Sequence, residues 1–332
     1  TVRTPAEYVS STPSESAFNN GTLWGLKGNF GAKVTDAWSK TQGKSDVVVA
    51  VLDTGITTHT DLGPQVSGYD MISELGVAND GNGRDANPAD PGDWISKNDS
   101  DGLTFGGQLR GCRVGDSSWH GTHVAGTVNA SINGVGSVGV APQVRVQNVR
   151  VLGKCGGLTS DIAAGIIWAA GGYVAGAPAN SSPADVISLS LGGGRGCSSV
   201  EQEAIDYALG QGAILTIAAG NENTDASNSA PGNCAGVITV AASDISGKRA
   251  WFSNYGATVE IAAPGVSIYS TMNTGTEGPE AQDYVSWNGT SMATPHVAGV
   301  VALMLSRNPN LTPAQVLERI QNNATAVGGG VC

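Results

Sequence analysis

Charged residues are scarce in this chain of 332 residues, because Asp, Glu, Lys and Arg together make up only 14% of it. The basic residues number 17 against 28 acidic ones, which gives a net charge of −11. Such a surface argues against nucleic acid and anionic membranes as partners, because both are themselves negative, and it suits a protein that holds cations. Long apolar runs are also missing, and none reaches the ~20 residues needed to span a bilayer. We therefore expect a soluble monomer.

The five cysteines are not arranged in Cys-x-x-Cys pairs, which argues against a zinc or redox site. Their wide spacing favours two disulfides and one leftover cysteine in an oxidising compartment. The chain begins at Thr1, without a Met and without a signal peptide. We therefore expect a processed, mature form of a secreted protein.

Strands and helices alternate along the chain. The continuous β-branched run at 46–52 predicts a strand buried on both faces. Further strands are expected at 144–152, 184–191, 213–219, 237–242 and 259–263, with helices at 32–40, 158–170, 200–211 and 312–323. This alternation predicts a three-layer α/β/α fold around a mostly parallel central sheet. No repeat or linker interrupts it, so residues 1–332 are expected to form one domain.

Three side chains of complementary chemistry stand at the ends of expected elements. Asp53 follows the first strand, and His120 and Ser291 each lie near the start of a helix. A nucleophilic serine needs a base to take its proton and a carboxylate to orient that base. The dipole of the helix favours the anionic intermediate that such a serine makes. Pro295 is expected within the first turn of that helix, where its missing N–H is not needed.

Other hydrolase classes fit this pattern less well. The chain order Asp, His, Ser and the absence of a Gly-x-Ser-x-Gly motif around Ser291 disfavour an esterase or lipase. His120 and His123 are three residues apart and lack the glutamate of a zinc protease motif, so we expect His123 to be an interior histidine.

Residues 70–119 are rich in Asp, Asn and Gly and predict a long insertion of loops. Oxygen ligands at alternate positions around glycines are typical of a calcium loop, although the spacing is not that of an EF-hand. Acidic turns without a metal are the alternative. The candidate calcium ligands in this insertion are Asp80, Asp85, Asp90 and Asp93.

Five segments resemble the subtilisin-like serine proteases, or subtilases, in the same order. They are Asp-Thr-Gly at 53–55, His-Gly-Thr-His-Val-Ala-Gly-Thr at 120–127, Ser-Leu-Gly-Gly at 190–193, Ala-Ala-Gly-Asn at 218–221 and Gly-Thr-Ser-Met-Ala-Thr-Pro-His at 289–296. In detail the chain looks most like the secreted, calcium-binding members from Gram-negative bacteria. The resemblance implies a secreted serine endopeptidase that folds with the help of its own propeptide and cleaves proteins and peptides.

The resemblance assigns a role to each catalytic residue. Asp53 would orient His120, which would act first as general base and then as general acid. Ser291 would attack the peptide carbonyl. Asn221 would donate a hydrogen bond to the oxyanion, together with the backbone N–H of Ser291. A catalytically silent binding protein with the same fold is the alternative.

The resemblance also implies a substrate cleft. Two glycine-rich backbone segments would pair with an extended peptide, and a roomy apolar first pocket with small walls would give broad specificity. Glu222 at the mouth of this pocket would help to admit Lys or Arg. The implied substrate-binding residues are Ser190, Leu191, Gly192, Gly193, Gly156, Gly157, Ala218, Ala219, Gly220, Glu222 and Ser229.

Calcium is the cofactor that the resemblance implies, with a tight site formed by two side chains and by backbone oxygens of a loop. The implied ligands are Asp61, Ser131, Asn133, Val135 and Ser137, and Glu260 falls near an acid of a weaker site. The amide ligand that the family supplies from its N-terminal segment has no clear counterpart in the sequence.

The resemblance implies that the cysteines pair as Cys112–Cys155 and Cys197–Cys234, which leaves Cys332 over. The first bond would tether residues 101–119 beside the substrate-binding edge. We hypothesise that this tethered loop is an exosite for large substrates, and a purely stabilising staple is the alternative.

Overall fold

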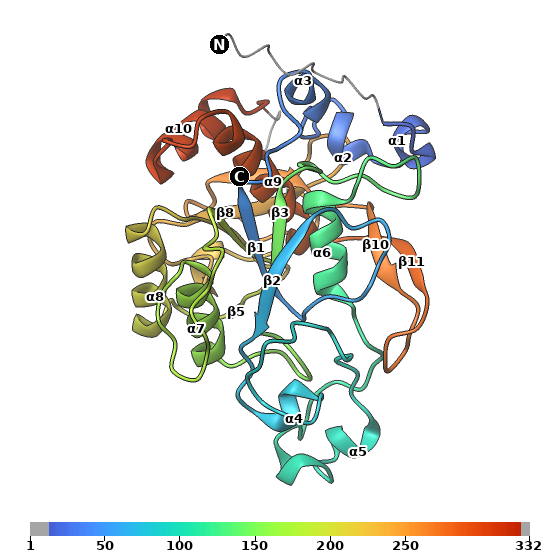
Figure 1. Ribbon diagram of the computed structural model, residues 1–332, viewed down its shortest axis with the longest axis vertical. Helices are drawn as coiled ribbons and strands as arrows, with labels where there is room; N and C mark the ends of the chain where they lie inside the picture. The colour runs from blue at the N-terminus through green and yellow to red at the C-terminus, as the bar shows by residue number, and fades with distance from the viewer. Residues whose placement is uncertain (1–12, 327–332) are drawn as a thin grey trace, which may run out of the picture.

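The computed structural model describes residues 13–326. Within them, a sheet of seven parallel strands runs through the molecule in the spatial order β2-β3-β1-β4-β6-β8-β9 (Figure 1). The strands are β1 Val48–Asp53, β2 Gln65–Asp70, β3 Arg145–Arg150, β4 Val186–Leu189, β6 Ile214–Ala218, β8 Ile238–Ser243 and β9 Ile261–Pro264. The central strand β1 is buried throughout, as the apolar run predicts.

Helices cover both faces of the sheet, and alternate residues of β1 pack against different layers. Val49 and Val51 belong to a core shared with α6 and α9, whereas Val48 and Leu52 belong to a core shared with α7 and α8. This split follows from the period of two in a strand. The helices are α6 His120–Asn129, α7 Thr159–Ala169, α8 Ser199–Gly210 and α9 Thr290–Arg307. The predicted three-layer α/β/α architecture is confirmed.

The remaining elements are short or peripheral. Among them α10 confirms the helix predicted at 312–323, and Thr312 begins it with a capping box. These elements are α1 Ser16–Asn19, α2 Trp24–Lys27, α3 Val34–Trp38, α4 Leu75–Ala78, α5 Lys97–Ser100, η1 Phe105–Gly107, β5 Gly193–Gly194, η2 Ala226–Asn228, β7 Ser229–Ala230, β10 Ile268–Asn273, β11 Gln282–Trp287 and α10 Pro313–Asn323. None of the helices within residues 13–326 has both the length and the apolar character that crossing a membrane would require.

The sequence did not predict β2 or the antiparallel hairpin β10–β11. Both β2 and β11 are edge strands with several exposed or half-buried residues, so neither carries the apolar run that identifies a buried strand. The hairpin lies beside α6 and thereby becomes one wall of the site described below (Figure 1).

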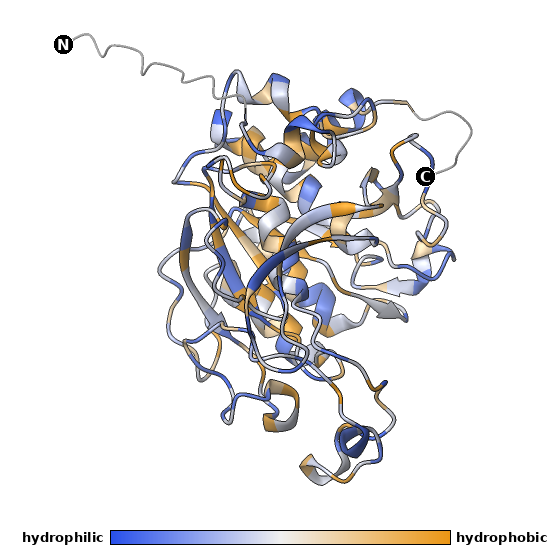
Figure 2. Cartoon of the chain, turned by 90° about the vertical axis from the view of Figure 1, so that its right-hand side faces the viewer, coloured by the Kyte–Doolittle hydropathy of each residue, from blue (hydrophilic) through white to orange (hydrophobic). Residues whose placement is uncertain are grey.

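The insertion forms a lobe that projects beyond the sheet and carries α4 and α5, as both views in Figures 1 and 2 show. The disulfide Cys112–Cys155 ties this lobe to the segment that follows β3. A buried ion pair adds a second tie, because Lys154 Nζ lies 3.1 Å from Asp99 Oδ2. Figure 2 shows apolar stretches along the central strands, with hydrophilic residues on the surrounding loops.

Candidate active site

The carboxyl end of β1 brings an aspartate against the first residue of α6. Asp53 ends the strand, and its two carboxylate oxygens lie 2.8 and 2.9 Å from Nδ1 of His120. The Asp53 side chain is 1% exposed and that of His120 is 21% exposed, so the carboxylate is shielded while the ring reaches the surface. With its proton on Nδ1, the imidazole donates to Asp53, and Nε2 is left to accept a proton.

Carboxylates around His120 favour its charged form. Burial is the largest influence and acts against the imidazolium, but the charge and hydrogen bond of Asp53, together with the charges of Asp93 and Asp90, outweigh it. The pKa of His120 is therefore raised above the usual 6.5. A ring held in this way is suited to taking a proton and keeping it during a reaction.

Ser291 lies at the same end of the sheet as this pair, where the parallel strands have their carboxyl ends. It is the second residue of α9, half-buried, and its Oγ donates to the carbonyl oxygen of Ser190 at 3.2 Å. Ser190 directly follows β4, and β4 pairs with β1 with Leu189 opposite Leu52. Asp53 follows Leu52 and Ser190 follows Leu189, so the two residues stand side by side on neighbouring strands, which lie about 5 Å apart. The Ser291 hydroxyl is bonded to Ser190 rather than to His120 in this structure.

The prediction that Pro295 lies in the first turn of its helix is wrong. Because α9 begins at Thr290, Pro295 is its sixth residue and stands in the helix interior. A proline there leaves the carbonyl four residues earlier without its helical donor, and that carbonyl belongs to Ser291. The hydroxyl of Ser190 replaces the missing donor and bonds this carbonyl at 2.8 Å.

Asn221 is held in one orientation by Thr290, a residue that the sequence reasoning did not single out. Its Oδ1 accepts from the backbone N–H of Thr290 at 2.8 Å and from the Thr290 hydroxyl at 3.0 Å. Because the oxygen is engaged, Nδ2 of this exposed side chain remains available as a donor. The threonine of Gly-Thr-Ser was the available sequence signal.

Trp287, at the end of β11, forms an aromatic wall that the sequence reasoning also missed. Its ring stacks on His123 at 4.9 Å and lies 6.1 Å from the ring of His120. His123 is fully buried, and its Nε2 lies 3.0 Å from the carbonyl oxygen of Ile268 and 3.2 Å from that of Val285. Burial lowers the pKa of His123 to about 3, so this histidine is neutral and interior, as predicted.

The two predicted substrate segments leave the sheet on either side of β1. Residues 154–158 lie after β3, where Gly153 and Gly156 form a tight backbone bridge, and residues 190–193 directly follow β4. Gly193 and Gly194 pair with Ala230 and Ser229 in the two-stranded ladder β5–β7. Since β3 and β4 flank β1 in the sheet, both segments lie beside the strand that carries Asp53.

Two of the predicted pocket residues, Glu222 and Ser229, lie against Gly220. Ala218 and Ala219 are buried at the end of β6, and Gly220 has a φ of 101°, which favours glycine. A Cβ added there would lie 2.6 Å from Glu222 Oε2 and 2.8 Å from Ser229 Oγ. Glu222 Oε2 also accepts from Asn254 Nδ2 at 2.8 Å, which holds the carboxylate over Gly220. A cavity of about 970 Å³ lies elsewhere, between α3, α9 and α10.

The predicted tight calcium site is an oxygen-rich loop around Asp61. Asp61 Oδ1 accepts from Asn133 Nδ2 at 2.9 Å and Oδ2 accepts from the N–H of Ser137 at 2.9 Å. Burial raises the pKa of Asp61 above its usual value, partly offset by these hydrogen bonds. The other predicted loop residues, Ser131 and Val135, lie in the same turn.

Glu15 completes this cluster and was not foreseen in the sequence. Its carboxylate is fully buried, and Oε1 accepts from the backbone N–H groups of Asn133 and Gly134, each at 2.7 Å. Its Oε2 is buried without a hydrogen-bond partner. An unpaired anionic oxygen costs free energy unless a cation or donor meets it, so this donor set suits Ca²⁺. Glu260 lies apart, bonded to the N–H of Thr239.

The four aspartates predicted as calcium ligands in the insertion are hydrogen-bonded to different protein groups. Their partners are Arg150 for Asp80, Asn82 and Asn87 for Asp85, Thr54 and Gly92 for Asp90, and Ser118 for Asp93. In the described part of the chain, no three His, Cys, Asp or Glu side chains are grouped to hold a metal. The geometry of the insertion thus gives no support to a calcium site there.

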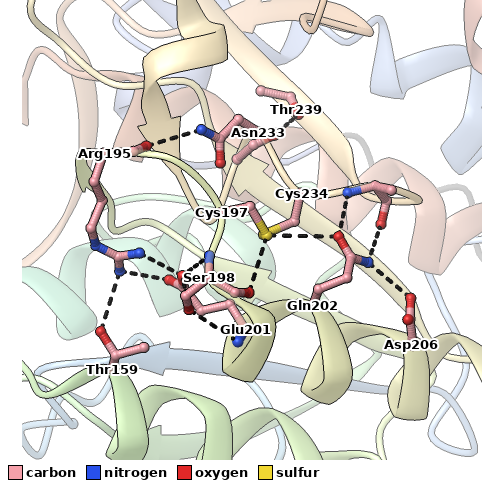
Figure 3. The surroundings of a disulfide bond; sticks show 12 residues. Thr159, Arg195, Cys197, Ser198, Glu201, Gln202, Asp206, Asn233, Cys234 and Thr239 are labelled. Atoms are coloured by element: carbon pink, nitrogen blue, oxygen red, sulfur yellow. Dashed lines mark hydrogen bonds and ion pairs between the residues drawn. A yellow bond between two sulfur atoms is a disulfide. The ribbon is translucent and has the colours of Figure 1, made fainter.

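Both predicted disulfides are present, with Cα–Cα distances of 5.7 Å for Cys112–Cys155 and 5.2 Å for Cys197–Cys234. The second lies beside the start of α8, where the buried Glu201 accepts two hydrogen bonds from Arg195 (Figure 3). Burial opposes the charged form of Glu201, but the Arg195 and Ser198 hydrogen bonds lower its pKa below the usual value. Cys332, left over in this pairing, lies outside the described residues.

Comparison with known proteins shows the family to which the chain belongs. The model of the subtilase family matches residues 44–331, and the chain belongs to that family. It is 49% identical over 97% of its length to an extracellular protease of Xanthomonas campestris pv. campestris, and 45% identical over 97% to an extracellular basic protease of Dichelobacter nodosus. It covers 54% and 53% of these two relatives, about half their length. Among solved structures, a protease from Pseudoalteromonas arctica superposes with a TM-score of 0.90 at 47% identity, covering 95% of this chain and 93% of that one.

Proposed function

We propose that the chain is the peptidase domain, over residues 1–332, of a secreted serine endopeptidase that uses Asp53, His120 and Ser291. The observation that carries this proposal is the Asp53–His120 hydrogen bond at the carboxyl end of the parallel strands, where Ser291 lies in the first turn of α9. Family membership and relatives named as extracellular proteases support the activity and the secretion. A monomer without nucleic-acid or membrane partners accords with the acidic composition.

The proposed reaction begins when the Ser291 hydroxyl turns from the Ser190 carbonyl to Nε2 of His120. His120 takes the hydroxyl proton while Oγ attacks the peptide carbonyl carbon, and Asp53 stabilises the imidazolium that forms. Nδ2 of Asn221 and the N–H of Ser291 donate to the resulting oxyanion. His120 then returns the proton to the leaving amine, and water releases the acyl group from Ser291 by the same steps in reverse.

The proposed substrate is an extended segment of a protein or peptide. It would lie between residues 154–158 and 190–193 and add its backbone to them as a strand. Ala218, Ala219 and Gly220 would form small walls of the first pocket and admit large apolar side chains. Glu222, anchored over Gly220, adds a negative charge that suits Lys or Arg in the same pocket.

We also propose one calcium ion at the loop around Asp61. The oxygens of Asp61, Asn133 and Glu15, with backbone carbonyls of residues 131–137, would hold it. The ion would join the segment that carries Glu15 to the loop after α6 and so stabilise the fold. The buried and unpartnered Oε2 of Glu15 is the observation that supports this site.

Labelling with a peptidyl phosphonate tests the catalytic proposal against the alternative of a silent binding protein. We expect the phosphonate to modify Ser291 stoichiometrically, to abolish cleavage of casein, and to leave a Ser291→Ala variant unlabelled. A wild-type chain that is folded but neither labelled nor active would contradict the proposal and favour the binding protein.

A further inference from the structure

Asp90 is a buried carboxylate of the insertion that no step of the proposed reaction uses. Its side chain is 2% exposed, and both of its oxygens are engaged. Oδ1 accepts from the N–H of Gly92 at 2.9 Å, and Oδ2 accepts from the hydroxyl of Thr54 at 2.6 Å. The insertion therefore reaches the residue that directly follows Asp53.

Backbone hydrogen bonds hold Asp90 in this place. Its N–H donates to the carbonyl of Ile56 at 3.0 Å, and the N–H of Ile56 donates to the carbonyl of Pro88 at 3.1 Å. The insertion thus runs beside residues 54–56 as a short parallel bridge. A carboxylate fixed at both its backbone and its side chain offers a precise hydrogen-bond acceptor.

Thr54 links the two segments that carry the catalytic pair. Its N–H donates to Asp53 Oδ1 at 2.8 Å, and its Oγ accepts from the N–H of Gly121 at 3.0 Å, next to His120. A threonine hydroxyl has only one hydrogen to donate. Because that hydrogen goes to Asp90, a lone pair of the same oxygen is left to face Gly121.

The two segments have little freedom to adjust at this point. A Cβ added to Gly121 would lie 2.2 Å from the carbonyl oxygen of Gly55 and 3.2 Å from Cβ of Asp53. The start of α6 is therefore packed directly on the backbone around Asp53. Because the packing is this close, we expect that loss of the Thr54–Gly121 hydrogen bond would shift the start of α6 against β1, and with it the ring of His120 against Asp53.

We propose that Asp90 is a positioning residue for the Asp53–His120 pair, acting through the hydroxyl of Thr54. This inference rests on the proposed function, and it assigns to the insertion a part in catalysis that its predicted calcium binding does not include. Asparagine at position 90 keeps the volume but has one acceptor oxygen where the site requires two. The Thr54 hydroxyl is then free to turn toward other acceptors.

The test compares Asp90→Asn, Thr54→Val and Thr54→Ser with Asp206→Asn, a matched control on the exposed surface of α8. Turnover of a short chromogenic peptide is measured on the plateau of the pH profile, with active sites counted by the phosphonate. We expect Asp90→Asn and Thr54→Val to lower kcat about tenfold or more while KM changes less than about twofold. Thr54→Ser, which keeps the hydroxyl, and Asp206→Asn should stay near the wild type.

The double variant Asp90→Asn/Thr54→Val separates positioning from general destabilisation. If both residues act on one path, the double variant is no slower than the slower single one. The inference would be overturned, while the proposed function stands, if Asp90→Asn kept the wild-type kcat per titrated site. It would also be overturned if the fold-loss of kcat in the double variant equalled the product of the two single fold-losses, because the residues would then act independently. Recovery of Asp90→Asn by millimolar calcium would also overturn it, because Asp90 would then act as a metal ligand. A wild type that the phosphonate does not label would remove both the proposed function and this inference.

Discussion

Ser190 and Ser291 exchange two hydrogen bonds, the Ser190 hydroxyl donating to the Ser291 carbonyl at 2.8 Å and the Ser291 hydroxyl donating to the Ser190 carbonyl at 3.2 Å. The first bond exists because Pro295, four residues after Ser291, has no N–H to donate. The end of β4 therefore supports the nucleophile where its own helix cannot. Ser190 belongs to a segment predicted to bind substrate, so one segment would serve both tasks.

We expect Ser190→Ala to destabilise the protein and slow the reaction together. The variant leaves the partly buried Ser291 carbonyl without this donor, which costs about 1 kcal/mol, the lower end of the range for a buried group. We expect a lower free energy of unfolding by about that amount and a several-fold lower kcat, because Oγ of Ser291 is attached to the displaced backbone. Urea denaturation and peptide turnover measure the two effects.

Pro295→Ala in the Ser190→Ala background is the matched control for this explanation. Alanine restores an N–H that can donate to the Ser291 carbonyl, so the double variant should regain stability relative to Ser190→Ala. Simple addition of the two single losses would mean that the two residues do not share this carbonyl.

The pH dependence of kcat/KM should follow His120. General-base catalysis needs the neutral ring, and the neighbouring carboxylates raise the pKa of His120 above 6.5. Activity should therefore rise as the pH rises through that raised pKa. The Asp93→Asn variant removes a negative charge that stabilises the imidazolium, so the pKa of His120 should fall. The acid limb of the kcat/KM profile should therefore move to lower pH. Profiles of kcat/KM for both proteins measure this, and a limb that does not move would show that Asp93 has no electrostatic effect on His120.

The sequence singled out the proposed catalytic residues because each stands at a boundary that local patterns mark. The β-branched run before Asp53, and the motifs that begin α6 and α9, are contiguous segments. Their predicted places at strand and helix ends agree with the structure. The disulfide pairs were also predicted, although from the resemblance rather than from the spacing.

The supporting contacts could not be predicted because they join segments that are far apart in the chain. Glu15 meets Asn133 across 118 positions, and Trp287 reaches His120 only because the unpredicted strand β11 lies beside α6. The error on Pro295 has a local cause, since the helix begins at Thr290 rather than nearer the proline. Exposed edge strands and single buried carboxylates carry too little pattern to be recognised.

Removal of calcium should lower the thermal stability, and Glu15 should account for part of the effect. A ligand at a hundredfold excess over its Kd stabilises the folded state by about 2.7 kcal/mol. We expect a chelator to lower the Tm of the wild type, and we expect this difference to shrink in Glu15→Gln. Scanning calorimetry with and without calcium measures it.

Glu203→Gln, on the exposed face of α8, should keep the full calcium effect and serves as the control for the change of charge. A wild-type Tm that does not respond to the chelator would remove the calcium site. A full response in Glu15→Gln would leave the site but exclude Glu15 from its ligands.

The tethered loop of residues 101–119, which is one part of the lobe, should contribute to the cleavage of proteins more than to that of short peptides. It is tied beside the predicted substrate segment by Cys112–Cys155, and it exposes apolar side chains: Leu103 is 73% exposed, Phe105 43% and Val114 53%. An extended protein substrate that continues past the cleft can bury these side chains, whereas a tetrapeptide is too short to reach them. Replacing all three with serine should lower kcat/KM for casein several-fold and leave that for a tetrapeptide unchanged.

Tyr173→Ser removes an apolar side chain that is 86% exposed outside the lobe and is the matched control. It should affect neither substrate. The Cys112→Ser/Cys155→Ser variant separates an exosite from a staple, because loss of the tether should reduce casein cleavage even at temperatures well below unfolding. If the triple serine variant loses casein and tetrapeptide cleavage equally, the tethered loop only stabilises the fold, and its apolar surface takes no part in substrate binding.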